Sequence, residues 1–522
     1  MDMRKKLVKL LKVLSAILLL FFLILAIAVI WPMPKLATPE KYDSILIKSV
    51  NVIDVESGTI LENRDILIKD NLINVIDTSG MLKPDPETLI LDNEGKYVMP
   101  GLWDMHTHSN QHSEWLHHPL YIANGVTGVR DMSGQLNERD SYWAGSVERL
   151  KWNEELSNNV RVTPRYVLQS SYQMDGASSV PDGFPEFFKL QKPEDADALL
   201  DFYQNEQVDF IKVYQQILPP SYKRLALQAP KYGMHIAGHK PAFVSLEDAI
   251  LLGQRSFEHG RIFLFESFPE ADCLRTTKNW KQFFSTSKES MVEDFDPEIA
   301  KELMQLMKAH NSHWTPTLQT LKFEAYAHEE SFLDNPNLKY ITWVRKNLWW
   351  AIDAQNNKKR NLSNKGQGLS ERFFRASREQ VKMANHMGVP IMTGTDVTDS
   401  YTFAGFSMHC ELEDLTKSGL SNLEALQCAT IVPAKFAEKE DHYGSVESGK
   451  IADLAILNKN PLEDISHTKT ISGVLMNGTY YDADKIDELK KYSQSNASSF
   501  HINVKALFSL INSPLIRRQF AD

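Results

Sequence analysis

The stretch VMPGLWDMHTHS, residues 98–109, places His106 and His108 one residue apart after a short apolar run. In a β-strand the side chains of residues i and i+2 point to the same face, so the two imidazoles can converge on one point. A metal ion bound at that point would explain the pair, because imidazole is a common metal ligand. The chain has 16 histidines, and an isolated pair could equally be structural. Ligand types elsewhere in the chain must decide between these interpretations.

The elements that must position these residues follow a strand-then-helix rhythm through the middle of the chain. Amphipathic helical patterns lead into short apolar runs, as where SLEDAILLG precedes QRSFEHG. This alternation indicates an α/β fold with a parallel sheet. Eight strands are predicted, which is the number in a (β/α)8 TIM barrel. They cover 98–108, 125–134, 161–171, 208–214, 233–239, 254–260, 312–318 and 388–396.

Segments with a different pattern of apolar and polar residues flank this middle part. SILIKSVNVIDV, which begins at Ser44, and later KIADLAILN and ISGVLMNGTYYD alternate apolar and polar residues with a period of two. Such alternation is typical of antiparallel strands with one buried face. We therefore predict a small β-sandwich-like domain built from both chain ends, residues 44–98 and 444–484. The barrel with long insertions would occupy 99–443, and a helical tail 485–522.

Residues 1–36 are predicted to be a membrane segment and linker. A basic flank, MDMRKKLVKLLK, precedes nineteen residues without charge, Val13 to Trp31. As one helix this run would cover about 28 Å, close to the thickness of a hydrocarbon core. The basic flank predicts that the N-terminus stays in the cytoplasm and that the catalytic domain lies outside it. The alternative is a cleaved signal peptide, which would give a secreted or periplasmic protein.

Composition limits the partners and the chemistry. The formal net charge is −10, and no basic block occurs in the body of the chain, so nucleic acid is not an expected partner. A small-molecule substrate is expected, and a homo-oligomer is compatible with the sequence. The three cysteines, Cys273, Cys410 and Cys428, lie far apart and show no zinc-finger spacing. A thiolate metal site is therefore not indicated.

Five of the eight predicted strands end in a residue type that can bind a metal ion. In a TIM barrel the carboxyl ends of all strands meet at one mouth, so residues far apart in the chain can form one site. This arrangement favours a functional site over scattered structural histidines. The residues are His106 and His108 on the first strand, Lys212 on the fourth, His239 on the fifth, His259 on the sixth and Asp396 on the eighth.

The motifs that carry these residues resemble, in this order, the amidohydrolase superfamily, and above all its imidazolonepropionase-like and Xaa-Pro dipeptidase-like branch. They are PGLWDMHTHS, DFIKVY, AGHKP, FEHG, TGTD and GSVESGKIADLAILNKNPLEDI. The resemblance runs from about Ser44 to Asp482. It implies a centre of two divalent metal ions, with Lys212 converted by carbon dioxide to a carbamate. The implied ligands are His106, His108, Lys212, His239, His259 and Asp396.

Nitrogen and oxygen ligands without thiolate suit Zn²⁺ best, with manganese, cobalt and iron as alternatives. The charged ammonium of Lys212 cannot bind a cation, but its carbamate has two oxygens that can bridge two ions. The alternative is that Lys212 forms an ion pair with a nearby acid such as Asp209.

A water shared by two such ions would be acidified to hydroxide near neutral pH and would be the expected nucleophile. Asp396 is the catalytic candidate, since it could take up the proton and return it to the leaving amine. The expected function is hydrolysis of a C–N bond in a peptide, cyclic amide or related amide. Alternatives are an esterase, lactonase or phosphotriesterase with the same centre, or a non-catalytic binding protein on this fold. Lys212 argues against a deaminase, because related deaminases generally use one metal and lack this lysine.

Four residues that follow strand ends are candidate substrate contacts, because loops at this face form substrate pockets. They are Tyr172, Tyr214, Lys240 and Arg261. Lys240 or Arg261 could bind a substrate carboxylate, although ordinary surface charge would explain either. The long segments 261–311 and 320–378 predict lids over the site. The aromatic cluster in the second, YITWVRKNLWW, could instead pack on the barrel wall or dock on the membrane.

Overall fold

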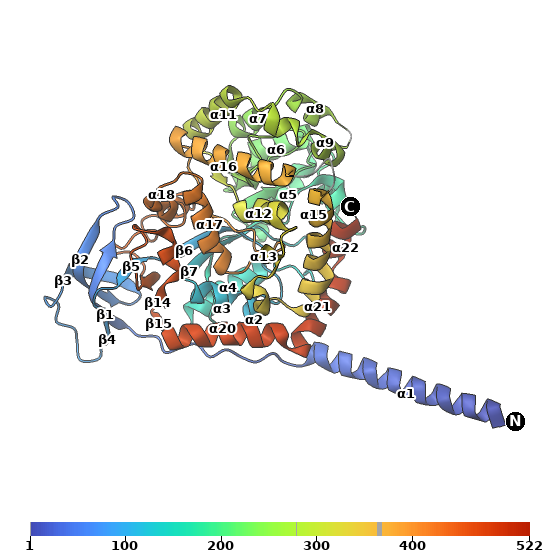
Figure 1. Cartoon of the computed structure of the whole chain (residues 1–522), viewed down its shortest axis with the longest axis horizontal. Coiled ribbons are helices and arrows are strands. Elements are labelled where there is room, and N and C mark those ends of the chain that lie inside the picture. The colour runs from blue at the N-terminus through green and yellow to red at the C-terminus, as the bar shows by residue number, and fades with distance from the viewer. Residues whose placement is uncertain (1, 278, 363–367, 522) are drawn as a thin grey trace.

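The computed structural model describes residues 2–277, 279–362 and 368–521. It contains a small β domain, a larger α/β part, and a long helix that projects from the side opposite the β domain (Figure 1). Residues 363–367, which belong to the second long segment, lie outside the described residues.

The α/β part is TIM-barrel-like. Its strands form two parallel sheets, one in the order β6-β7-β8 and one in the order β12-β11-β10-β9. Each strand is short and mostly buried, as expected for strands covered by helices. The strands are β6 (Leu102–Thr107), β7 (Val126–Asp131), β8 (Arg165–Leu168), β9 (Phe210–Val213), β10 (His235–Gly238), β11 (Gln254–Glu258) and β12 (His313–Thr315).

Isolated bridges continue the pairing between these sheets. Ser170, just after β8, pairs with Phe210 of β9. On the other side, segment 391–397 lies between β12 and β6, because Ile391 pairs with Trp314 and Val397 with Thr107.

The segment predicted as the eighth strand is therefore irregular. Its backbone N–H groups bond to several different partners, as where Thr393 donates to the Cys428 carbonyl and Asp396 to the His106 carbonyl. Asp396 also has a φ of 60°, which lies outside the extended region. These departures explain why the segment makes bridges instead of a regular ladder.

Helices of the predicted amphipathic type follow the strands. In α11 (Pro297–Ala309) the buried residues Ala300, Leu303, Met304 and Met307 recur every three or four positions. Asp296 caps its N-terminus by accepting from two backbone N–H groups, which fixes where the helix begins. The other helices of this layer are α2 (Ser113–Leu116), α3 (His118–Ala123), α4 (Ser146–Ser157), α5 (Asp195–Asn205), α6 (Pro219–Gln228), α7 (Leu246–Leu251), α16 (Leu369–Met387), α17 (Phe406–Lys417), α18 (Asn422–Gln427) and α19 (Ile431–Phe436).

The two long segments fold into short helices. Between β11 and α11 lie α8 (Ala271–Thr276), α9 (Trp280–Ser287) and α10 (Ser290–Glu293). Between β12 and α16 lie α12 (Leu318–Tyr326), α13 (Glu330–Leu333), α14 (Trp343–Arg345), a π-helical turn (Lys346–Trp350) and α15 (Ala351–Leu362).

Strands from both parts of the chain form the small domain's sheet. Its order is β15-β14-β13-β5-β1-β2-β3, with β4 paired to β1. The antiparallel pairing of β5 with β13 joins the N-terminal and C-terminal contributions. The strands are β1 (Ser44–Ile53), β2 (Ile60–Lys69), β3 (Leu72–Thr78), β4 (Leu89–Asp92), β5 (Tyr97–Pro100), β13 (Leu454–Leu457), β14 (Ile471–Met476) and β15 (Thr479–Asp482).

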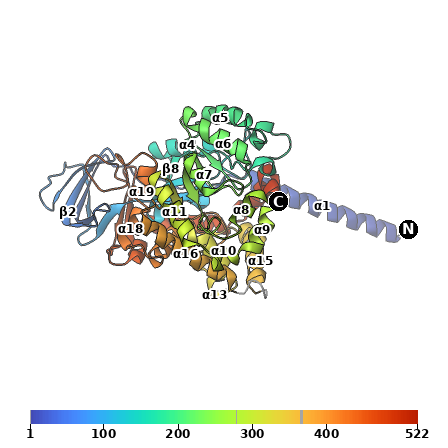
Figure 2. The ribbon, with the colours of Figure 1, turned by 90° about the horizontal axis from the view of Figure 1, so that it is seen from above.

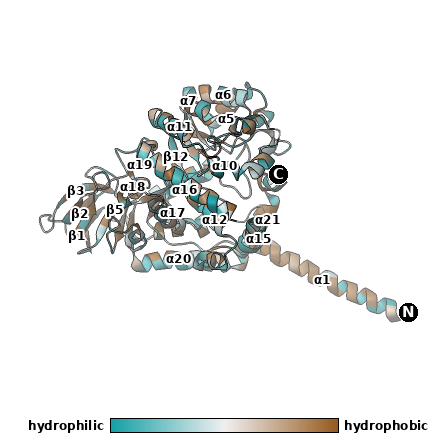
Figure 3. Cartoon of the chain, turned by 45° about the horizontal axis from the view of Figure 1, so that its top comes forward, coloured by the Kyte–Doolittle hydropathy of each residue, from teal (hydrophilic) through white to brown (hydrophobic). Residues whose placement is uncertain are grey.

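Helix α1 (Asp2–Ile30) is long and apolar enough to be a membrane anchor or a signal sequence. Figure 2 and Figure 3 show it leaving the body of the protein, and the colours of Figure 3 show that most of its residues are hydrophobic. Its end meets the C-terminal helices, where Lys505 donates a hydrogen bond to the Val29 carbonyl and Trp31 stacks on His501. These helices are α20 (Ala483–Ser498), α21 (Phe500–Asn512) and α22 (Pro514–Ala521).

Candidate metal centre

A cavity of about 1350 Å³ lies at the carboxyl ends of the strands of the α/β part. All six residues predicted as metal ligands line it: His106, His108, Lys212, His239, His259 and Asp396. They come from β6, β9, segment 391–397 and the residues directly after β6, β10 and β11. The topology therefore brings together side chains that are widely separated in the sequence.

The imidazoles of the site face one another across this cavity. The ring centroids of His106 and His108 are 5.2 Å apart, and those of His239 and His259 are 4.4 Å apart. One nitrogen of His108 and of His259 is held by a hydroxyl: Nδ1 of His108 lies 3.1 Å from Ser133 Oγ, and Nδ1 of His259 lies 2.8 Å from Thr317 Oγ1. Nε2 of His108 lies 2.8 Å from Asp396 Oδ1, whereas Nε2 of His259 makes no hydrogen bond.

Three imidazole nitrogens in this cavity are buried and make no hydrogen bond: Nε2 of His106, Nδ1 of His239 and Nε2 of His259. A buried polar atom without a partner costs free energy, so such a cluster calls for an explanation. A cation bound by these nitrogens would satisfy all three. Ligand atoms of His106, His259 and Asp396 also lie within 4.8 Å of one another, close enough to hold one ion.

The protonation of the histidines suits this chemistry, because imidazole must be neutral to bind a metal. Burial lowers the pKa of His239 and His259 well below the usual value. Burial and the nearby Lys212 lower the pKa of His108 to about 4, although Asp396 opposes them.

Asp396 stands among the histidines in a left-handed backbone conformation, with a φ of 60°. Its Oδ1 lies 2.8 Å from His108 Nε2, and its Oδ2 lies 3.6 Å from His259 Nδ1. Burial alone would raise the pKa of this carboxyl, but His106, His108 and His259 bring the pKa well below its usual value. The carboxylate is therefore ionised and available as a ligand or a proton acceptor.

Lys212 is 1% exposed, lies on β9 and lines the cavity. Burial lowers the pKa of its amine to about 8, against the opposing effect of Asp396 and Glu258. A larger fraction of the amine is thus neutral near pH 7 than for an exposed lysine. Asp209, the alternative ion-pair partner, instead accepts a hydrogen bond from the Gln169 backbone N–H at 2.7 Å.

A buried ion pair supports His106, and the sequence analysis missed it. Glu258 Oε2 lies 2.9 Å from His106 Nδ1, while Oε1 accepts a hydrogen bond from Arg130 Nη2 at 2.8 Å. The carboxylate fixes the ring and leaves Nε2 toward the cavity. Burial opposes ionisation of Glu258, but Arg130 and His106 lower its pKa to about 2. A charged residue inside a predicted buried strand, Arg130 at 125–134, was the available signal for a buried partner.

We expect Glu258→Gln to lower the free energy of unfolding by about 3–5 kcal/mol, because it leaves the charge of Arg130 buried without its partner. Urea unfolding of the full chain measures the change. The matched control is Glu438→Gln, which removes the exposed ion pair with Arg255 and should cost less than about 1 kcal/mol. Equal effects of the two substitutions would contradict the structural role of the Arg130–Glu258 pair.

Asp104, another buried acid near His106, holds the turn that carries Asp396. Its oxygens accept hydrogen bonds from the Thr395 backbone N–H at 3.0 Å and from Thr395 Oγ1 at 2.6 Å. It contacts the backbone of His106, and Glu258 contacts the ring.

The four candidate substrate contacts divide into two groups. Tyr214 and Arg261 line the cavity. Within the described part of the chain, Tyr172 and Lys240 lie outside its lining. The Tyr172 hydroxyl donates to the Ser179 carbonyl, and Lys240 forms a buried ion pair with Glu266 at 2.5 Å. Lys240 thus neutralises an interior acid at this position.

Both long segments contribute walls to the cavity. Trp280 and Phe284 come from α9, and Trp349 comes from the π-helical turn. Gln519 of α22, in the predicted helical tail, also lines the cavity. Nothing in the local sequence of the tail could have indicated this contact.

Comparisons with known proteins agree with this picture. The model of the Amidohydrolase family matches residues 274–480. The chain is 43% identical over 115 residues to 5-methylthioadenosine/S-adenosylhomocysteine deaminase of Acetivibrio thermocellus, which is 21% of this chain and 27% of the relative. It is 38% identical over 91 residues to dihydroorotase of Carboxydothermus hydrogenoformans, which is 16% of this chain and 20% of the relative. The chain spans only 10% to 27% of the length of the curated relatives it matches.

Solved structures share the fold over most of the chain. Bottromycin amidohydrolase matches with a TM-score of 0.65 and 21% identity, covering 88% of this chain and 91% of that one. A Xaa-Pro dipeptidase with bound methionine in its active site matches with a TM-score of 0.58 and 21% identity, covering 84% and 100%. At this level of identity the likeness establishes the fold alone.

Proposed function

Since the family match and the shared fold support membership of the amidohydrolase superfamily, we propose that the chain is a metal-dependent hydrolase of carbon–nitrogen bonds. The observation that carries the proposal is the group of three buried imidazole nitrogens that make no hydrogen bond, next to the Asp396 carboxylate and the buried Lys212. A merely structural cluster would leave these nitrogens unsatisfied at a cost in stability.

The centre would hold two divalent cations, with zinc the preferred metal for this donor set. The ligands would be His106, His108, His239, His259, Asp396 and a carbamate formed from Lys212 and carbon dioxide. When bound, such ions acidify water and polarise a substrate carbonyl.

Side chains of the protein would transfer the proton and bind the substrate. Asp396 would accept the proton released when water attacks the carbonyl carbon and would deliver it to the departing nitrogen. Its ionised state at neutral pH supports this order, because the carboxylate must begin as a base. Tyr214 and Arg261, which line the cavity, would contact the substrate, and Arg261 would suit a substrate carboxylate.

The complete eight-stranded barrel at 99–443 is part of the same proposal, as are the small β domain at 44–98 and 444–484 and the tail at 485–522. The bridges of Ile391 and Val397 support barrel closure. The pairing of β5 with β13 supports a small domain shared by both chain regions.

The first test is metal content. We expect close to two divalent ions per full-length chain after metal-supplemented expression, measured by elemental analysis. His239→Ala should lower this number, because it removes one of the unpaired nitrogens. His409→Ala is the matched control, since His409 is equally buried and also has one ring nitrogen without a hydrogen bond, but its Nδ1 bonds to Thr468 and it is not among the described residues that line the cavity. One ion or none in the unmodified protein would rule out the two-metal centre.

A panel of dipeptides, cyclic amides and simple esters then separates the reaction classes. Turnover of amides supports the proposed function. Turnover of esters, lactones or phosphotriesters alone would assign the same centre to a different bond. Metal binding without any turnover would favour a binding protein on this fold.

We further propose that α1 is an uncleaved membrane anchor, with its basic end in the cytoplasm and the catalytic part outside. The apolar surface of α1 and its long uncharged run support this. A reporter fused after Asp522 should register outside the cytoplasm, and the protein should stay in the membrane pellet after salt washing. Release of a shortened soluble form would instead indicate a cleaved signal peptide.

A further inference from the structure

Helix α21 is apolar on its outer face as well as on its inner face. Ile502, Ala506 and Ser509 are buried against the body of the protein. On the opposite side Phe508 is 51% exposed and Ile511 is 59% exposed. Soluble surface helices usually carry polar residues on the outer face, so this pattern indicates that something other than water covers it.

The neighbouring helix α20 shows what an ordinary surface helix of this protein looks like. Its buried positions are Ile486, Leu489, Ser493, Asn496 and Ala497. Apart from Ala483 its exposed positions are charged or polar, and they include Asp484, Lys485, Asp487, Glu488 and Lys491. The apolar outer face of α21 is therefore absent from its neighbour α20.

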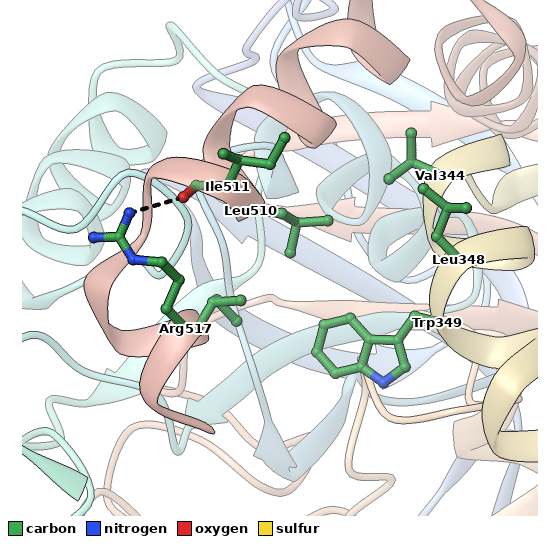
Figure 4. A pocket seen from close by; sticks show the side chains of 7 residues that line it. Val344, Leu348, Trp349, Leu510, Ile511 and Arg517 are labelled. Carbon is green, nitrogen blue, oxygen red and sulfur yellow. Dashed lines mark hydrogen bonds between the residues drawn. The ribbon is translucent and has the colours of Figure 1, made fainter. Parts of the chain in front are cut away.

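The exposed apolar surface continues from α21 onto the second long segment. Trp343, Leu348 and Ile352 are exposed there, on α14, the π-helical turn and α15. A groove of about 420 Å³ lies between the two, with Arg517 at its rim, where the guanidinium donates to the Ile511 carbonyl at 3.0 Å (Figure 4). Its lining is otherwise apolar: Val344, Leu348, Trp349, Leu510, Ile511 and Ile516. We call Trp343, Leu348, Ile352, Phe500, Leu507, Phe508 and Ile511 the apolar face.

The position of α1 indicates what covers this face. Helices α1 and α21 are in contact, through the Lys505–Val29 hydrogen bond and the stacking of Trp31 on His501 at 6.1 Å. In two views α1 extends away from the side of the protein that carries α21 and α15 (Figures 1 and 3). If α1 crosses a bilayer, its end at Ile30 lies at the lipid–water boundary, and α21 lies at the same level.

From this geometry we infer that the apolar face rests in the interfacial layer of the same bilayer that α1 crosses. The inference rests on the membrane anchoring proposed above and adds a second, broader contact to it. Tryptophans are typical of this layer, and both Trp31 and Trp343 are exposed here. Amphipathic helices bury their apolar side chains in this boundary without crossing it.

A lipid surface fits this face better than a second protein copy. Because α1 tethers the protein through Trp31, directly beside His501, the bilayer is present at α21 whenever the anchor is inserted. The contact also has a consequence for the catalytic cavity. Trp349 lines both the groove and the cavity, so the substrate site borders the membrane face.

The test uses the full chain in phosphatidylcholine–phosphatidylglycerol vesicles, with a fluorescent label on single introduced cysteines. Cys273, the one exposed native cysteine, is replaced by serine, whereas Cys428 is buried and Cys410 is largely so. Labels are placed at Leu18→Cys in α1, Phe508→Cys in the apolar face and Asp487→Cys on the polar face of α20. Leu507→Cys provides a second reading of the face if the Phe508 variant does not fold. A sample of the Cys273→Ser protein without an introduced cysteine measures labelling of the native thiols.

Lipids that carry nitroxide groups should quench the labels at positions 18 and 508, and aqueous iodide should quench the label at 487. Suppose that iodide quenches the label at position 508 as strongly as the label at 487, while the label at 18 is still quenched by lipid. This result would overturn the inference and leave the anchor intact. A label at 508 protected from both quenchers would indicate a protein contact and would also overturn it. Absence of lipid quenching at 18 would remove the anchor and the inference together.

Discussion

Lys212→Ala is expected to lose bound metal and to lose more than about 100-fold in hydrolytic activity, because removing even an indirect ligand partner typically costs 10- to 100-fold. Lys212 lies on β9 with 1% exposure and opens onto the cavity that contains the four histidines. If its carbamate bridges two ions, the alanine variant removes a ligand from both at once. Elemental analysis and turnover of the best amide substrate measure the two losses in parallel.

Small carboxylic acids should partly restore both metal and activity to Lys212→Ala, since a carboxylate can occupy the space of the carbamate. Lys212→Arg should remain inactive, because the guanidinium stays charged and cannot form a carbamate. Lys322→Ala is the matched control, as Lys322 pairs with Asp414 outside the cavity lining. A fully metallated and active Lys212→Ala protein would refute the bridging role.

Asp396→Asn is expected to lower kcat by about 10²- to 10⁴-fold, the usual contribution of a general acid–base group. Asparagine keeps the shape of the side chain and a carbonyl oxygen near His108 Nε2, but it cannot carry the proton. The four histidines and Lys212 should retain most of the metal. Occupancy and kcat must therefore be measured on the same preparation.

Asp175→Asn is the control for this substitution. Asp175 also lines the cavity and is buried, but its oxygens accept hydrogen bonds from Gln216. Its replacement should change kcat much less than that of Asp396. Near-normal kcat with normal metal content in Asp396→Asn would show that another residue delivers the proton to the leaving group.

That the six candidate residues meet in one cavity could be predicted from the sequence, because it depends on local pattern and simple topology. Short apolar runs that end in His106, His239 or Asp396 mark strand ends, and a barrel brings strand ends to one mouth. All six predicted ligands line one cavity. The residues that hold these side chains in place could not be predicted in the same way. Glu258 and Arg130 meet only because β7 and β11 face the same interior, and no local spacing encodes that pair.

Three other features could not be predicted from the sequence because they depend on contacts between distant residues. Lys240 follows a strand end, as a substrate-binding residue would, yet the interior acid Glu266 lies within its reach. The last predicted strand has a suitable apolar pattern. Its backbone N–H groups, however, donate hydrogen bonds to several different segments, and Asp396 has a left-handed conformation. Gln519 reaches the cavity because α22 packs beside it, a position that the tail sequence alone does not specify.

The bond between Asp104 and Thr395 joins residues 291 positions apart, and it holds the turn that places Asp396 beside His106 and His108. Closing such a long loop lowers the conformational entropy of the chain, and contacts that form later must offset this cost. A fold rich in such distant pairs has a high contact order and forms slowly. During synthesis, His106 and His108 leave the ribosome long before Asp396 does. An ion held by His106 and Asp396 together would bind only after the Asp104–Thr395 contact has formed, so under the proposed function metal loading would be a late event in the maturation of the chain.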